Sequence, residues 1–444
     1  MATIANIPYV LVHFDQKGKP LDPLVLPEGI TDLFVVSHGW NNTQADAESL
    51  YTELFTNVAA VAPASLLNRK LAILGIIWPA KKFTELVQAT AKSGGAASIG
   101  SRDNADGTLR AKLDLLQELF GPDSAATIQA AKDQILTMED DPAARDSFVS
   151  LLLGLVDRSA AHRDDATDKL FKLTGSQLLE KLKVDTPLPP PSASAGGAAS
   201  LRSEAETPQE LGGGAAGLGD VFTGIKAGAT RFLNFLTYYE MKARAGTVGT
   251  GVGLLLDEQL PASVERIHLV GHSFGGRLVS AAALASCTDK IKSMTLLQAA
   301  FSHNGFSDNF DNSSTPHPGY FRPVIDQKRV DGPILITYTP NDIAVGILYP
   351  AASRLSGTVA SAYGDKNDKF GGIGRNGAQK MKPGEVKEDV NKLLPVNGSY
   401  AWQTGKIHNL EASDFIRDPK GIDAHGFVKG KEIAWAIGSA ASSV

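Results

Sequence analysis

The chain has 444 residues, of which 43 are Lys or Arg and 48 are Asp or Glu, so its formal net charge is −5. A chain of this length can bury a large core and has room for one catalytic domain with an insertion. The slightly acidic balance excludes a broadly basic surface that would bind nucleic acid or anionic membrane, and no stretch reaches the ~18 apolar residues that span a bilayer.

The N-terminus and the cysteine content bear on the cellular compartment. Residues 1–8 contain no basic region and no long apolar run, so no signal peptide is predicted and we expect a cytoplasmic protein. Export by a route without a cleaved signal is the alternative. The one cysteine, Cys287, cannot form an internal disulfide, and its place after an apolar helix predicts an inert packing residue. No His, Cys or Asp cluster has zinc spacing, and we expect no metal and no cofactor.

The first 80 residues are predicted to form strands of a buried sheet and one helix. Apolar runs predict an initial strand pair at 9–14 and 24–26 and a strand at 31–37. A helix is expected at 49–60 and a further strand at 71–78. The strand at 31–37 is apolar on both faces, which is typical of parallel sheets covered by helices on each side. We therefore expect an α/β fold with a mostly parallel central sheet.

Nearly 190 residues separate Trp78 from the next predicted strand at 266–270, where a minimal α/β fold needs one helix. Residues 93–107 are rich in Gly and Ala and are predicted to form a flexible loop. Apolar residues recur at helical spacing across 108–184 and predict three or four amphipathic helices. Pro and Gly runs in 185–219 leave little that could build a core, which indicates a flexible linker.

The motif Gly271-His272-Ser273-Phe274-Gly275 lies between the strand at 266–270 and a helix of small residues at 277–284. A serine on such a strand-to-helix turn adopts a strained backbone. The flanking positions must be Gly because a Cβ there would clash with the neighbouring strand and helix. The strain raises the hydroxyl above the sheet, and the N-terminus of the helix favours negative charge. Ser273 is therefore the candidate nucleophile.

The loop after the strand at 31–37 is the candidate oxyanion hole, and it begins with His-Gly-Trp-Asn-Asn at 38–42. In serine acyl hydrolases one donor is the backbone N–H of the residue after the nucleophile, here Phe274, and the second comes from the loop after an early strand. We predict that Trp40 supplies this second N–H, with Asn41 as the alternative. An ordinary strand-to-loop turn is the other interpretation. The further residues expected in the pocket or loop are His38, Gly39, Asn41 and His272.

The general base and its orienting acid are expected downstream of the serine. A serine hydroxyl needs an imidazole to take its proton, and a carboxylate must hold that imidazole in the right tautomer. The apolar run 333–339 predicts a strand that is followed by Pro340-Asn341-Asp342, and the acid is expected there. His425 lies in a loop before the last predicted helix at 431–441 and is the candidate base.

Other residues compete for these two roles. His408 is the rival base, but it lies in the run 407–416, which predicts a strand, and a histidine on a strand is more often packed in the core. Asp414 and Asp308 are the rivals of Asp342. A carboxylate in water at a strand end or in a loop is the ordinary interpretation of each.

With these motifs the chain resembles a serine hydrolase of the α/β-hydrolase superfamily. It is similar in particular to bacterial esterase- or lipase-like members that combine a His-Gly-Trp-Asn-Asn loop with Gly-His-Ser-Phe-Gly-Gly, and the stretch 239–249 adds to the resemblance. The resemblance covers roughly 4–92 and 220–440. It implies the α/β-hydrolase fold, Ser273, Asp342 and His425 as a catalytic triad, and Trp40 and Phe274 as oxyanion donors. It does not identify the substrate.

The expected domain organisation follows from these segments. We expect 1–92 and 220–444 to form the α/β-hydrolase catalytic core, 93–184 to form a helical insertion that caps the active site, and 185–219 to be a Pro/Gly/Ala-rich linker. The insertion leaves and rejoins the core between strands whose ends lie near Ser273, which favours a cap. A bundle packed to one side is the alternative. Aromatic residues of a helix at 221–243 are expected to pack on the sheet, with an acyl pocket as the alternative.

These residues predict two-step acyl transfer to water. Carboxylic esters are the expected substrates, as small molecules or lipids, because alcohols leave more easily than amines. An amidase or peptidase is the enzymatic alternative. A binding protein that keeps the α/β-hydrolase fold without activity is the alternative from another class.

Overall fold

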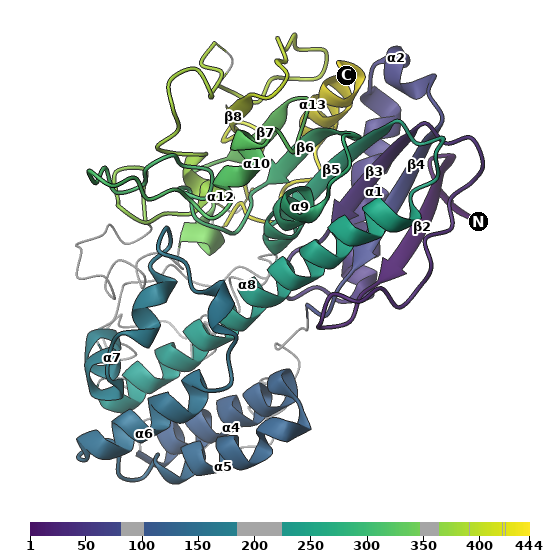
Figure 1. Ribbon diagram of the computed structural model, residues 1–444. Coiled ribbons are helices and arrows are strands. Elements are labelled where there is room, and N and C mark those ends of the chain that lie inside the picture. The colour runs from purple at the N-terminus through teal and green to yellow at the C-terminus, as the bar shows by residue number, and fades with distance from the viewer. Residues whose placement is uncertain (81–101, 184–223, 347–363, 390, 420, 422) are drawn as a thin grey trace.

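The computed structural model describes residues 1–80, 102–183, 224–346, 364–389, 391–419, 421 and 423–444 (Figure 1). Within these residues a sheet of eight strands has the order β1-β2-β4-β3-β5-β6-β7-β8. β1 is antiparallel to β2, and the other neighbouring strands are parallel. The strands are β1 (Ala2–Ile4), β2 (Ile7–His13), β3 (Asp32–Ser37), β4 (Leu71–Ile77), β5 (Arg266–His272), β6 (Ile291–Leu297), β7 (Ile334–Tyr338) and β8 (Ile407–Glu411).

Helices cover both faces of the sheet, as the apolar strands predicted. In β3, Leu33 belongs to the core cluster that includes residues of α8 and α9, and Phe34 belongs to the cluster that includes residues of α1 and α13. Successive side chains of a strand point to opposite faces, so β3 is buried by both layers. The helices of the core are α1 (Gln44–Val61), α2 (Ala64–Leu67), α8 (Ile225–Gln259), α9 (Phe274–Ala285), α10 (Arg322–Asp326), α12 (Ile373–Asn376) and α13 (Lys431–Ser442).

α8 is longer than the helix predicted at 221–243, because it continues through the glycine-rich stretch that follows. Two of these glycines face α9. A Cβ on Gly249 would lie 2.2 Å from the carbonyl oxygen of Leu278, and a Cβ on Gly253 would lie 2.7 Å from that of Ala282. Glycine is therefore required for the close approach of α8 to α9, and this packing offsets the helix-weakening effect of glycine.

Four α-helices precede α8 in the described part of the insertion: α4 (Arg102–Phe120), α5 (Ala125–Asp133), α6 (Pro142–Leu153) and α7 (Gly175–Leu182). They gather around the N-terminal half of α8, and α8 leads from this group to the sheet (Figure 1). Apolar residues of the group belong to the same core cluster as one face of the sheet. The three or four helices predicted for 108–184 are confirmed.

Three local predictions are wrong. Residues 24–26 form no strand, because Pro23 and Pro27 flank them and the N–H of Leu24 donates instead to the side chain of Gln259 at 3.2 Å. Residues 102–107 are the first turns of α4 rather than a loop, and Asp106 pairs with Lys226 of α8 at 2.6 Å. The remainder of that loop, 93–101, and the linker predicted at 185–219 lie outside the described residues.

The third wrong prediction concerns Cys287, which is exposed rather than packed. α9 ends at Ala285, Ser286 is still buried, and Cys287 is the first exposed residue after it. Asp257 of α8 holds this segment by accepting hydrogen bonds from the backbone N–H of Cys287 at 2.9 Å and from the hydroxyl of Ser286 at 2.6 Å.

In the described ranges, none of the helices combines the length and apolar character that crossing a bilayer requires.

Candidate active site

Ser273 occupies the sharp turn between β5 and α9. Its φ of 56° and ψ of −123° are unusual for a residue with a side chain and cost of order 1–3 kcal/mol. A Cβ on Gly271 would lie 2.3 Å from the carbonyl oxygen of Gly275, and a Cβ on Gly275 would lie 2.2 Å from that of Ser37. Both glycines are therefore required sterically. The Ser273 N–H donates to the Leu297 carbonyl at 3.0 Å, which ties the turn to the end of β6.

The loop after β3 lies directly beside this turn. A Cβ on Gly39 would lie 2.6 Å from Cβ of Ser273. The buried ring of Trp40 packs edge-on against Phe274, with ring centroids 6.1 Å apart. The side chain of Asn42 donates to the carbonyl oxygens of Gly39 and Trp40 at 3.0 and 3.1 Å. Asn41 has a positive φ of 63°. The structure thus brings the loop and the start of α9 together, and the first N–H groups of a helix have no acceptor within the helix.

His38 stabilises the conformation of this loop through hydrogen bonds and ring stacking. Its Nδ1 lies 2.8 Å from the carbonyl oxygen of Gly39, and its own carbonyl accepts a 3.0 Å hydrogen bond from the indole N–H of Trp78. Its ring stacks on that of Trp78. Burial lowers the pKa of His38 to about 4, so the ring is neutral at pH 7 and its Nδ1–H donates to Gly39.

Asp342 and His425 come together from distant parts of the chain. Asp342 follows β7, and its fully buried Oδ2 lies 2.9 Å from Nδ1 of His425, which is also fully buried. Oδ2 also accepts a hydrogen bond from Nε2 of Gln298 at 3.1 Å, and Oδ1 accepts one from the N–H of Val345 at 2.9 Å. The carboxylate is thus held by three donors, one of which is the imidazole.

The second ring nitrogen of His425 is an unsatisfied polar atom of the site, as are the indole nitrogen of Trp40 and Oε1 of Gln298 among the described residues. The Nε2 atom of His425 is buried and has no hydrogen-bond partner within the part of the chain that the structure describes, so no hydrogen bond joins it to Ser273. Burial lowers the pKa of His425, but the charge and hydrogen bond of Asp342, followed by the charge of Asp423, outweigh burial and raise it. An imidazole with Nδ1–H directed at a carboxylate has a lone pair on Nε2, which is the form that accepts a proton.

His272 connects the serine turn with the histidine loop. Its Nε2 donates to the carbonyl oxygen of His425 at 3.0 Å, and the two rings are 4.9 Å apart. Burial, followed by the neighbouring charge of His425, lowers the pKa of His272 to about 3, so the ring is neutral. The residue before Ser273 therefore anchors the loop that carries His425.

Two polar residues of this site were not assigned a role from the sequence. Gln298 follows β6 and also donates from Nε2 to the carbonyl of Gly374 at 2.7 Å. Asp423 lies two residues before His425 and is buried. The sequence could have indicated Gln298 as a site residue, because it lies at the carboxyl end of a parallel strand and such ends meet at one edge of the sheet.

The residues that competed with His425 and Asp342 in the sequence lie in other surroundings. His408 lies on β8, where burial lowers its pKa to about 4 and Nε2 accepts a hydrogen bond from the N–H of Gln403. Asp414 is exposed. Asp308 pairs with Lys382 at 3.0 Å.

The insertion is fastened to the core close to the serine. Arg277 lies one helical turn after Ser273 in α9, and one of its guanidinium nitrogens is 3.1 Å from Nε2 of His162 in the insertion. The ring of His162 stacks on Tyr320 with centroids 3.8 Å apart. Buried Lys242 of α8 lies 2.5 Å from Asp165 Oδ2. Burial, followed by the charge of Asp165, raises the pKa of Asp164 to about 6.

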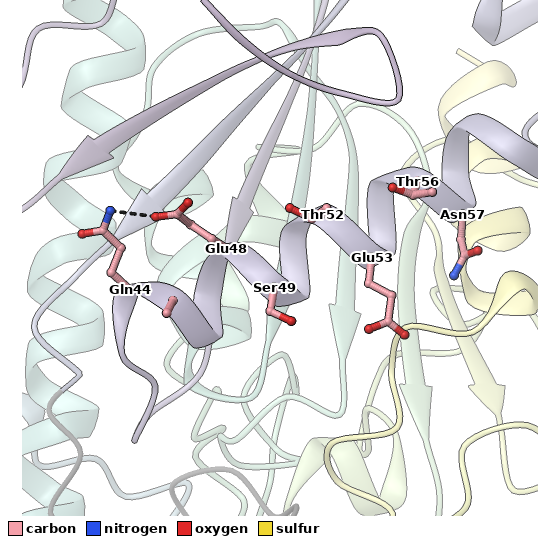
Figure 2. Close-up of a pocket in the computed structure, with 8 residues that line it drawn as sticks. Gln44, Glu48, Ser49, Thr52, Glu53, Thr56 and Asn57 are labelled. Carbon is pink, nitrogen blue, oxygen red and sulfur yellow. Dashed lines mark hydrogen bonds between the residues drawn. The ribbon is translucent and has the colours of Figure 1, made fainter.

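A hollow of the described surface lies away from these residues. It has a volume of about 930 Å³ and runs along the outward side chains of α1, where Gln44 donates to Glu48 at 2.7 Å (Figure 2). Neither Ser273 nor Asp342 nor His425 lines it. It is lined by Gln44, Ala45, Glu48, Ser49, Thr52, Glu53, Thr56 and Asn57. Within the described residues, no group of three His, Cys, Asp or Glu side chains could hold a metal ion.

Comparison with known protein families places residues 257–326 under a family described as alpha/beta hydrolase fold. This segment contains β5, the Ser273 turn, α9, β6 and α10. Searches of curated proteins and of solved structures found no match to the chain. The matched segment and the mostly parallel sheet flanked by helices agree, so the chain has the α/β-hydrolase fold. The match supports a relationship to the α/β-hydrolase superfamily and a hydrolase-type or fold-related function.

Proposed function

We propose that this protein is a serine hydrolase that cleaves carboxylic esters, with Ser273 as nucleophile, His425 as general base and Asp342 as the acid that orients it. The single observation that carries the proposal is the buried pair of Asp342 Oδ2 and His425 Nδ1, 2.9 Å apart, with His425 Nε2 left without a partner among the described residues. A buried donor or acceptor without a partner costs about 1–3 kcal/mol, so it requires an explanation. Proton transfer with Ser273 provides one.

The proposed reaction has two steps. His425 Nε2 takes the proton of Ser273 Oγ as that oxygen attacks the carbonyl carbon of the ester, and Asp342 stabilises the imidazolium. His425 then protonates the leaving alcohol, which leaves an acyl-enzyme. Water attacks the acyl group by the same route and releases the acid. The hydrogen bond between Ser273 and His425 forms when substrate binds, because such bonds are often long before substrate arrives.

The negative oxygen of each tetrahedral intermediate needs two donors. We propose the backbone N–H groups of Phe274, at the start of α9, and of Trp40. The contact of the Trp40 ring with Phe274 and the close approach of Gly39 to Ser273 support this assignment. Loss of one such donor costs ~10²–10³ in turnover in other serine hydrolases.

We also propose that the insertion at 93–184 caps the site. Support comes from its described part, in which residues 158–168 contact α9 one turn beyond Ser273 and the segment after β6. In this proposal 1–92 and 220–444 form the catalytic core, and the cap excludes water from the reacting ester.

Labelling with a fluorophosphonate probe tests the function, together with hydrolysis of a panel of short- to long-chain esters and matched anilides. Ser273→Ala should abolish both labelling and turnover, and His425→Ala should abolish turnover. The control Ser49→Ala changes an exposed serine of α1 and should leave both unchanged. His408→Gln should also remain active. A folded wild-type protein that is not labelled and hydrolyses no ester would contradict the proposal, and faster cleavage of anilides than of esters would contradict the ester assignment.

A further inference from the structure

A second carboxylate lies beside the Asp342–His425 pair. Asp423 is 3% exposed and belongs to the loop before α13. Its Oδ1 accepts hydrogen bonds from three backbone N–H groups, those of His425 and Ile343 at 3.1 Å and that of Ala344 at 3.4 Å. One oxygen atom is therefore bonded both to the residue that carries the imidazole and to the two residues that follow Asp342.

These bonds connect two segments that are about 80 residues apart in the sequence. Residues 343–346 are helical, and because the first N–H groups of a helix have no acceptor within it, the Asp423 carboxylate supplies one. A backbone hydrogen bond from the N–H of Ala424 to the carbonyl of Asn341 at 3.1 Å reinforces the junction. The separation of Asp342 from His425 thus depends on Asp423.

The charge of Asp423 also acts on the imidazole. It adds to that of Asp342 in raising the pKa of His425, while burial, followed by the charge of Asp342, raises the pKa of Asp423 itself. Among the described residues, the charged or titratable groups beside this cluster include His272, which is neutral, and Asp418, whose Oδ2 accepts a hydrogen bond from the N–H of Asp423 at 3.2 Å. They also include Arg375, whose guanidinium donates to the backbone carbonyl of Asp342 at 3.0 Å.

We propose that Asp423 is a positioning residue of the active site, which holds the acid and base loops together and shares with Asp342 the stabilisation of protonated His425. This inference rests on the proposed function, because it assigns Asp423 to the same proton transfer. It adds a second buried carboxylate to the one that the reaction mechanism requires.

Two substitutions separate the two parts of this role. Asp423→Asn keeps an oxygen that accepts the three N–H bonds but removes the charge, whereas Asp423→Ala removes both. Because the imidazolium loses one stabilising charge, the pKa of His425 should fall in Asp423→Asn. The acid limb of kcat/KM should move to lower pH by the same amount, with kcat on the plateau within about tenfold of wild type. Asp423→Ala should lose kcat more than a hundredfold while KM changes little.

The experiment is a titration of His425 by NMR in protein labelled with [15N]histidine, in which His425→Gln assigns the signal, followed by pH profiles of ester hydrolysis. Asp414→Asn is the matched control, because Asp414 is an exposed aspartate nine residues away, and its profile should equal that of wild type. Thermal unfolding of each variant establishes that it folds. If Asp423→Ala does not fold, the NMR titration and pH profile of Asp423→Asn decide the outcome.

An unchanged His425 pKa in folded Asp423→Asn would overturn the shared stabilisation, and full activity of Asp423→Ala would overturn the positioning role. Failure of the proposed function is a different result, in which wild type is neither labelled nor active. The NMR titration needs no turnover, so it tests the charge of Asp423 in either case.

Discussion

Breaking the ion pair between Lys242 and Asp165 should strongly destabilise the protein, because one charge would be left buried without its partner. Its two charged atoms lie 2.5 Å apart, and the side chains are 1% and 5% exposed. Lys242 also donates to the carbonyl of Ala160 at 2.8 Å and to the hydroxyl of Thr167 at 3.0 Å. Since Asp165 lies in the insertion and Lys242 in α8, Asp165→Asn tests whether this pair fastens the insertion to the core.

The magnitude follows from the charge that Asp165→Asn would leave behind. Breaking a buried pair by removing one partner typically costs 3–5 kcal/mol. The cost has an upper bound, because Lys242 can instead lose its proton, which costs about 4–5 kcal/mol at pH 7 relative to an exposed lysine. Burial already lowers the pKa of Lys242, and the nearby carboxylate of Asp164 supplies part of the missing charge. We therefore expect a loss of about 3 kcal/mol.

Urea unfolding measures this loss, and hydrogen exchange over 157–170 reports whether the insertion separates from the core. Exchange should accelerate there, and fluorophosphonate labelling of Ser273 should slow because Arg277 of α9 contacts the same segment. Lys172→Met is the control, since it breaks an ion pair with Asp168 in which the lysine is 58% exposed, and it should cost less than about 1 kcal/mol. A loss below about 1 kcal/mol in Asp165→Asn, with exchange unchanged, would show that this ion pair does not fasten the insertion to the core.

Three further predictions concern the site itself. Asp342→Asn should keep the fold and lower kcat by about 10⁴, because the amide no longer holds the His425 tautomer; turnover within tenfold of wild type would contradict the acid assignment. Gly275→Ala should lower the Tm and abolish labelling, because its Cβ would lie 2.2 Å from a carbonyl oxygen, whereas Gly107→Ala has nothing within 4 Å and should stabilise α4 by about 0.5–1 kcal/mol. For wild type, kcat/KM should rise with pH through a pKa above 6.5, because His425 must lose its proton to act as a base and its pKa is raised. The raised pKa also means that protonated His425 stabilises the folded protein below pH 6.5. This stabilisation should be lost as the pH rises through the raised pKa. A kinetic pKa below 6.5 would contradict that assignment.

Much of the fold could be predicted from the sequence, because periodic hydrophobicity and backbone sterics act over a few neighbouring residues. The doubly apolar β3 predicted a sheet buried on both faces, and this is confirmed. The glycines around Ser273 predicted the strained turn, since the contact between Gly271 and Gly275 depends on residues only four positions apart. Chain order, together with the resemblance, nominated Asp342 and His425.

The remaining features depend on residues that are distant in the sequence and become neighbours only when the chain packs. Asp342 and His425 are 83 positions apart. Gln298 donates to Asp342, and Asp423 accepts from the N–H groups of Ile343 and His425, and neither residue is marked by a local sequence pattern. α8 continues through its glycines because α9 packs against them, a contact that local helix propensity opposes. The two buried faces of the strands and the strained serine turn were thus predictable from local residues, because sterics and hydrophobic periodicity act over short stretches of chain. Which polar groups meet depends on the folded chain, because hydrogen bonds and ion pairs are set by distances in space.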